Sequence, residues 1–132
     1  MHALIIDDSR AIRRILRRIV EPLGFSVLEA EHGQDGLKKL HEHIETVELI
    51  LVDWNMPVMD GLQFVKALRA DPAIRRIPIV MVTTETEPAQ MARALMAGVD
   101  EFVMKPFTVE ILTEKLALIG VRTPTVHASG QP

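Results

Sequence analysis

The sequence contains no cysteine, and its 132 residues include only one tryptophan and four phenylalanines. The lack of cysteine excludes a disulfide framework and a thiolate metal site, and it agrees with a reducing compartment. Long hydrophobic runs are missing too, because every apolar run is much shorter than the roughly 20 residues of a membrane span. The paired acids Asp7 and Asp8 also come too early for a signal peptide. We therefore expect a cytoplasmic protein without membrane association.

A strong charge of one sign is also lacking. Fifteen basic and 18 acidic residues give a net charge of -3, which provides no general attraction to nucleic acid. The stretch RRILRR carries Arg13, Arg14, Arg17 and Arg18 without interleaved aromatic residues, and we interpret it as a solvated helix face. With 48% hydrophobic and 25% charged residues, the chain is expected to form one globular domain.

Two hydrophobic periods alternate along the chain. Continuous apolar runs predict strands buried on both faces at Ala3 to Ile6, Phe25 to Ala30, Leu49 to Val52, Ile79 to Val82 and Phe102 to Met104. Helical spacing links Ile12, Ile15, Leu16, Ile19 and Val20; Leu37, Leu40 and Ile44; Leu62, Val65 and Leu68; and Leu112, Leu116 and Ile119, while Pro88 to Ala97 predicts a weakly apolar, loose helix. This alternation predicts a doubly wound α/β sandwich with a five-stranded parallel sheet over residues 1–119, followed by a flexible tail at 120–132.

Polar side chains follow four of these five predicted strands. Asp7 and Asp8 come after the first, Asp53 after the third, Thr83 and Thr84 after the fourth, and Lys105 after the fifth. Single residues have simpler explanations, since Asp8 or Ser9 could cap the following helix. Together they would meet at the carboxyl edge of the sheet, where such folds bind ligands. Three carboxylates gathered there repel one another, so the cluster predicts a cation site.

Oxygen ligands without nearby histidine or cysteine suit Mg²⁺ or Mn²⁺ better than zinc. An aspartate in such a site can attack phosphorus and form an aspartyl phosphate. A lysine and a threonine would then hold the transferred oxygens, because phosphoryl transfer depends mostly on positioning and charge neutralisation. The sequence therefore predicts phosphoryl-transfer chemistry centred on Asp53.

Four motifs, LIIDDS, LVDWNMPVMDG, VMVTTE and FVMKPF, resemble those of the receiver domains of two-component response regulators, most closely the single-domain chemotaxis type. The likeness covers about Met1 to Ile119 and implies a flavodoxin-like (βα)5 fold with strand order 2-1-3-4-5. It implies that Asp53 accepts the phosphoryl group and that Lys105 and Thr83 contact it. The implied metal ligands are Asp8, Asp53 and the main-chain carbonyl of Asn55, with Asp7 acting through water. Lys105-Pro106 would be a cis peptide bond.

The same resemblance implies a switch formed by Thr83 and the residue at 102. Here that residue is Phe102 where the chemotaxis proteins often carry tyrosine, so we expect its ring to point inward even before phosphorylation. Thr84 also replaces a usually small residue and narrows access to the site. Asn55 and Glu85 match the family positions that tune dephosphorylation.

The resulting functional hypothesis is a phosphorylation-activated signalling switch, not a metabolic enzyme. A histidine kinase would phosphorylate Asp53, and a downstream protein would bind the surface of the fourth helix, fifth strand and fifth helix; neither nucleic acid nor membrane is an expected partner. Three alternatives remain: a phosphate shuttle to a histidine phosphotransfer protein, an aspartyl-phosphate phosphohydrolase, and a flavin-binding protein of the same architecture. The acid cluster disfavours the last unless a metal is present.

Overall fold

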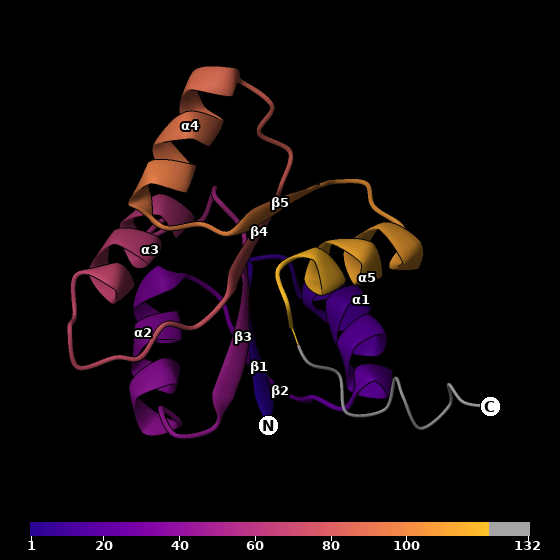
Figure 1. Cartoon of the computed structure of the whole chain (residues 1–132), viewed down its shortest axis with the longest axis horizontal. Helices are drawn as coiled ribbons and strands as arrows, with labels where there is room; N and C mark the ends of the chain where they lie inside the picture. The colour runs from indigo at the N-terminus through magenta and orange to yellow at the C-terminus, as the bar shows by residue number, and fades with distance from the viewer. Residues whose placement is uncertain (122–132) are drawn as a thin grey trace.

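The computed structural model describes residues 1–121, so residues 122–132 of the predicted tail lie outside the described part of the chain. Five parallel strands form one sheet in the order β2-β1-β3-β4-β5 (Figure 1). In chain order the elements are β1 (His2–Ile6), α1 (Arg10–Val20), the 3-10 helix η1 (Glu21–Leu23), β2 (Ser26–Ala30), α2 (Gly33–Glu42), β3 (Val47–Val52), α3 (Gly61–Arg69), β4 (Ile79–Thr83), α4 (Pro88–Ala97), β5 (Glu101–Met104) and α5 (Val109–Leu118). The predicted fold class and strand order are confirmed.

The sheet separates two hydrophobic cores, because successive strand residues point to opposite faces. One core lies under α2, α3 and α4 and includes Leu4, Ile6, Ile50, Val52 and Met81. The other lies under α1 and α5 and includes Ala3, Ile5, Leu49, Leu51 and Val82. Strands covered on both sides explain the continuous apolar runs of β1, β3 and β4. The prediction of burial on both faces is wrong for the edge strand β2, in which Ala30 alone is buried.

The helix predictions need correction on α1. Ile15 was placed in the apolar stripe, but it is 44% exposed, because Leu16, Ile19 and Val20 supply the buried face. Arg13 was placed on the solvated face, but it is only 8% exposed. Its position three residues before Leu16 and seven before Val20 puts it on the buried stripe, where the strand ends provide it with hydrogen-bond acceptors.

Helix α4 has the bounds that the sequence predicts, and Ala94 is its only buried residue. Leu95 and Met96 on this helix are 51% and 90% exposed. Few buried contacts mean that little hydrophobic free energy opposes local opening, so α4 is expected to belong to the less stable part of the fold. No helix within residues 1–121 combines the length and the apolar character that crossing a bilayer would require.

The loop between β3 and α3 contains an unfavourable backbone conformation. Val58 has a φ of 67° and is the one non-glycine residue at positive φ in the described residues 1–121. A β-branched side chain is disfavoured there by contact with its own backbone, and at 70% exposure little burial offsets this cost. Val58 is therefore a strained position in the loop that follows Asp53.

Replacing Val58 with asparagine, which tolerates the left-handed conformation, should stabilise the protein by about 1 kcal/mol. Chemical denaturation of the parent and variant would measure this difference. Val109 provides the matched control, because it is also an exposed valine, at 53%, but has a negative φ. A Val58→Asn variant that is destabilised as much as Val109→Asn would contradict the assignment of strain.

Candidate functional site

Two aspartates extend the hydrogen-bond ladders at the carboxyl ends of the central strands. The Asp7 main-chain N–H donates to the Ala30 carbonyl at 3.0 Å, and the Asp53 N–H donates to the Ile6 carbonyl at 2.9 Å. Both residues are thus held at the same edge of the sheet. Together with Asp8, each offers a carboxylate oxygen, and these oxygens lie within 4.8 Å of one another. The structure brings the three predicted acids into one site.

Lys105 supplies the positive charge closest to this cluster. Its Nζ lies 3.0 Å from Asp7 Oδ2 and 3.2 Å from Asp53 Oδ2. The second oxygen of each acid accepts a main-chain hydrogen bond, from Ser9 to Asp7 at 2.9 Å and from Trp54 to Asp53 at 2.7 Å. Asp7 and Asp53 are 1% and 8% exposed, so both are buried carboxylates with fixed orientations.

Asp8 differs from its neighbours in exposure and in role. It is exposed, and within residues 1–121 its side chain makes no hydrogen bond. The alternative that Asp8 caps the first helix is wrong, because the Ser9 hydroxyl accepts from the Ile12 N–H at 3.2 Å and caps α1. The Asp8 carboxylate therefore remains open to solvent beside two buried acids.

The site carries more negative than positive charge, and this alters how its groups ionise. Burial raises the pKa of Asp53, the charge of Asp7 raises it further, and Lys105 only partly offsets both effects. For Lys105, burial alone would lower the pKa, but the hydrogen bonds and charges of Asp7 and Asp53 outweigh it and raise the pKa. Both directions show that the cluster favours additional positive charge.

The donor set fits a hard divalent cation. The cluster consists of three carboxylates, two buried and one exposed, with their oxygens close enough to share one ion. Magnesium prefers such oxygens and keeps several waters, which the exposed side of Asp8 permits. The exposed Asn55 lies two residues beyond Asp53 and follows the buried Trp54.

The loop that carries Asp53 packs backbone against backbone on α3. The Gly61 N–H donates to the Trp54 carbonyl at 2.8 Å, and a Cβ at Gly61 would lie 2.1 Å from the Asp53 carbonyl oxygen. Asp60 caps α3 through a capping box with Gln63. Gly61 is a residue of the site that the motifs alone do not identify, although its place directly after the helix-capping Asp60 is a recognisable signal.

Thr83 and Lys105 sit on adjacent strand ends. Thr83 is fully buried, its carbonyl accepts from the Lys105 N–H at 3.0 Å, and its hydroxyl accepts from the Glu85 N–H at 3.2 Å. Within residues 1–121 the hydroxyl makes no hydrogen bond to Asp53 or Lys105. The Lys105-Pro106 peptide bond is cis, as predicted.

Phe102 pairs in register with Met81 and is 6% exposed, so its ring lies inward as the sequence predicts. It belongs to the same hydrophobic core as Ala94 of α4. Glu85 is partly buried and the neighbouring Thr84 is exposed. The predicted switch residues therefore connect the edge of the acid site with the core beneath α4.

Residues 3–117 match the family of response regulator receiver domains. The chain is 45% identical over 120 residues to the chemotaxis protein CheY1 of Helicobacter pylori, covering 90% of this chain and 96% of the relative. It is 39% identical over 123 residues to the chemotaxis protein CheY of Pseudomonas aeruginosa, covering 92% and 98%. The structure of Vibrio cholerae chemotaxis protein CheY4 superposes with a TM-score of 0.81 at 34% identity, covering 89% of this chain and 97% of that one.

The chain therefore belongs to the response regulator receiver domains. Within that class it is a receiver of the kind found in CheY chemotaxis response regulators, which signal by phosphorylation. Receiver domains bind Mg²⁺ at an acidic pocket, and the cluster of Asp7, Asp8 and Asp53 could hold such an ion.

Replacing Asp53 with asparagine should raise the melting temperature of the metal-free protein by the equivalent of about 1 kcal/mol, because it removes a buried charge beside Asp7. Mg²⁺ should raise the melting temperature of the parent more than that of the variant. Glu114→Gln is the control for a change of net charge, because Glu114 is exposed and has no ion pair within residues 1–121. Equal Mg²⁺ responses in parent and Asp53→Asn would contradict the shared metal site.

Proposed function

We propose that this receiver accepts a phosphoryl group from a histidine kinase onto Asp53 and thereby switches its affinity for a downstream protein in the cytoplasm. The observation that supports this most directly is the geometry of Asp53, a buried carboxylate held by Trp54 on one oxygen and facing Lys105 with the other. The receiver domain would span residues 1–119.

In this mechanism an Asp53 carboxylate oxygen attacks the phosphorus of a phosphohistidine, the P–N bond breaks, and the electron pair stays on the departing imidazole. Lys105 Nζ, now 3.2 Å from Asp53, holds the transferred phosphoryl oxygens as a point charge. The carboxylates of Asp8 and Asp53 and the main-chain carbonyl of Asn55 would hold Mg²⁺ or Mn²⁺, with Asp7 acting through water. The ion supplies charge neutralisation for the phosphoryl group.

Loss of the phosphoryl group would be a second reaction of the same site. Asn55 lies two residues beyond Asp53 and Glu85 two residues beyond Thr83, and their exposed or half-buried side chains would limit the approach of water. The protein would therefore catalyse only its own phosphorylation and dephosphorylation.

The signal would travel through Thr83 and Phe102. If the Thr83 hydroxyl leaves the Glu85 N–H and donates to phosphorylated Asp53, it vacates space beside Phe102 on the neighbouring strand. The inward position of Phe102 means that this change needs little movement of the ring. The surface of α4, β5 and α5 would respond, because Ala94 and Phe102 share one core.

Incubation with Mg²⁺ and a small phosphodonor such as phosphoramidate should increase the intact mass by one phosphoryl group. The Asp53→Asn variant should show no increase, because the attacking carboxylate is lost. Glu48→Gln is the control, since Glu48 is an exposed acid near the opposite end of β3. Phosphorylation of Asp53→Asn to the parent's extent would refute the assignment.

Hydrogen exchange with beryllofluoride, a phosphoryl mimic, should become slower across Pro88 to Ile119 in the parent protein. Thr83→Ala should reduce this effect, because the proposed hydroxyl contact is lost, yet it should leave Asp53 able to accept phosphate. Changes confined to Asp7, Asp8 and Asp53 would show that the signal does not follow the proposed route.

A further inference from the structure

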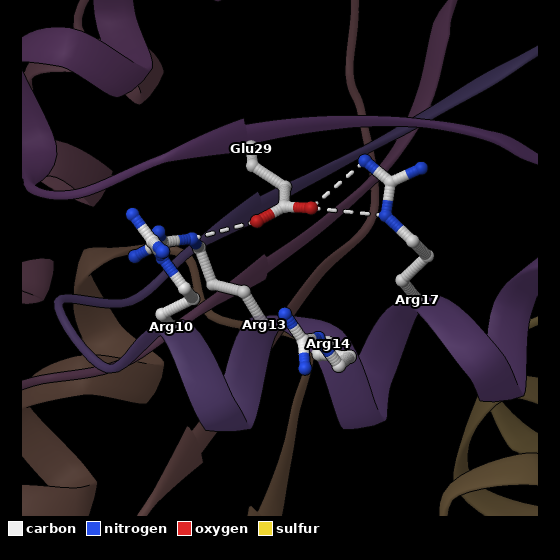
Figure 2. A pocket seen from close by; sticks show the side chains of 5 residues that line it. All are labelled: Arg10, Arg13, Arg14, Arg17 and Glu29. Carbon is white, nitrogen blue, oxygen red and sulfur yellow. Dashed lines mark hydrogen bonds and ion pairs between the residues drawn. The ribbon is translucent and has the colours of Figure 1, made fainter.

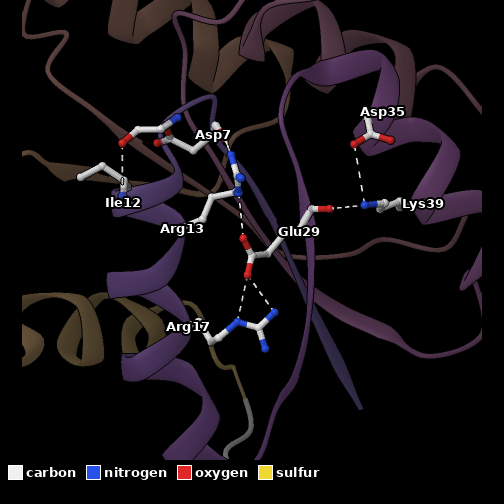
Figure 3. A network of polar contacts seen from close by, with 8 residues as sticks. Asp7, Ile12, Arg13, Arg17, Glu29, Asp35 and Lys39 are labelled. Carbon is white, nitrogen blue, oxygen red and sulfur yellow. Dashed lines mark hydrogen bonds and ion pairs between the residues drawn. The ribbon is translucent and has the colours of Figure 1, made fainter.

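Arg13 is buried, although the sequence pattern predicts a solvated position, and it connects the acid site to β2. Its Nη1 donates to the Asp7 main-chain carbonyl at 2.6 Å, and its Nε donates to Glu29 Oε1 at 2.8 Å. Figure 3 shows this chain of contacts running from the end of β1 through α1 to β2. Arg13 thus bridges two strands from one guanidinium group.

The other end of this bridge is itself fixed. The second oxygen of Glu29 accepts from Arg17 at 2.8 and 2.9 Å, and the Glu29 carbonyl accepts from Lys39 Nζ at 2.5 Å. Burial would raise the pKa of Glu29, but the hydrogen bonds and charges of Arg13 and Arg17 outweigh it and lower the pKa. Glu29 is therefore an ionised anchor for the Arg13 guanidinium, held by contacts from Arg17 and Lys39.

The Asp7 carbonyl has a particular importance because it belongs to the planar peptide unit that joins Asp7 to Asp8. The other polar groups of Asp7 already have partners in Ala30, Ser9 and Lys105. Within residues 1–121 the contact from Arg13 is thus the one hydrogen bond to the carbonyl of this peptide unit, and it restrains the rotation of the peptide plane leading to Asp8. That rotation determines where the exposed Asp8 carboxylate lies relative to Asp53.

We propose that Arg13 is a positioning residue for the metal-binding acids, and that Glu29 acts with it by holding the guanidinium on the Asp7 carbonyl. This inference rests on the proposed magnesium site, but it concerns residues that lie outside the cluster of acids. It predicts that a change at Arg13 or Glu29 alters cation affinity without removing any ligand.

The neighbouring arginines offer a matched control. Arg10, Arg13, Arg14, Arg17 and Glu29 line a hollow of about 370 Å³. Figure 2 shows that, of these four arginines, Arg13 and Arg17 contact the Glu29 carboxylate. Arg14 is exposed and has no ion pair or hydrogen bond from its side chain within residues 1–121. Arg13→Lys and Arg14→Lys therefore make the same chemical change on the same helix and preserve the charge. Only the first removes a group that bridges two acceptors.

Mg²⁺ affinity can be measured by the fluorescence of Trp54, whose main-chain N–H binds the Asp53 carboxylate. Arg13→Lys should weaken Mg²⁺ binding by about tenfold, in the range typical for residues that orient metal ligands. Arg14→Lys should bind Mg²⁺ like the parent. Glu29→Gln should also weaken binding, and the double variant with Arg13→Lys should be no weaker than Arg13→Lys alone, because both changes release the same contact.

A lower melting temperature of Arg13→Lys with unchanged Mg²⁺ affinity would overturn the proposal, since it would show that Arg13 only stabilises the fold. If Arg13→Lys fails to fold, Glu29→Gln decides the question, and unchanged affinity in that variant overturns the proposal too. If the parent protein does not bind Mg²⁺, both the proposed function and this inference are contradicted. Equal Mg²⁺ binding by the parent and Arg13→Lys would contradict this inference alone.

Discussion

Lys105 places one positive charge between two buried carboxylates, at 3.0 Å from Asp7 and 3.2 Å from Asp53. Without it the fold would bring two ionised acids together in a region with little water, which costs several kcal/mol in proteins. With it the cluster still carries an excess of negative charge, because within residues 1–121 one lysine stands against the three carboxylates of Asp7, Asp8 and Asp53. Lys105 therefore lowers the cost of burying Asp7 and Asp53, and the remaining negative charge still favours the binding of a further cation.

This charge arrangement depends on parts of the chain that are far apart in sequence. The acids follow β1 and β3 in the middle of the sheet, where both strands pair on each side. Thr83 ends β4, which pairs with β3 and β5, and Lys105 follows the edge strand β5. Phe102 of β5 shares a hydrophobic core with Ala94 of the sparsely buried α4. The acids therefore follow two central strands, whereas Lys105 follows an edge strand. The element with few buried residues on this side is α4, in which Ala94 alone is buried.

Much of this architecture could be predicted because each strand is a short, continuous apolar run ending in a polar residue. A short apolar run such as Leu49 to Val52 predicts a strand buried on both faces of a parallel sheet. The carboxyl ends of parallel strands lie at the same end of the sheet, which brings the polar residues that follow them together. Sequence patterns could not reveal Arg13, because a charge on an amphipathic helix is usually solvated and its acceptors, Glu29 and the Asp7 carbonyl, are nonlocal. They also could not reveal the φ of 67° at Val58, which its residue type disfavours.

The close contact between Gly61 and the Asp53 carbonyl ties the position of Asp53 to that of the whole helix α3. A Cβ at Gly61 would lie 2.1 Å from that oxygen, so no side chain lies between α3 and the loop to absorb a shift. Phe64 and Leu68 seat the same helix in the core, at 0% and 2% exposure. The position of Asp53 therefore depends on the position of α3. A core substitution that shifts α3 would also displace the Asp53 carboxylate, even if the substituted residue contacts no residue of the site.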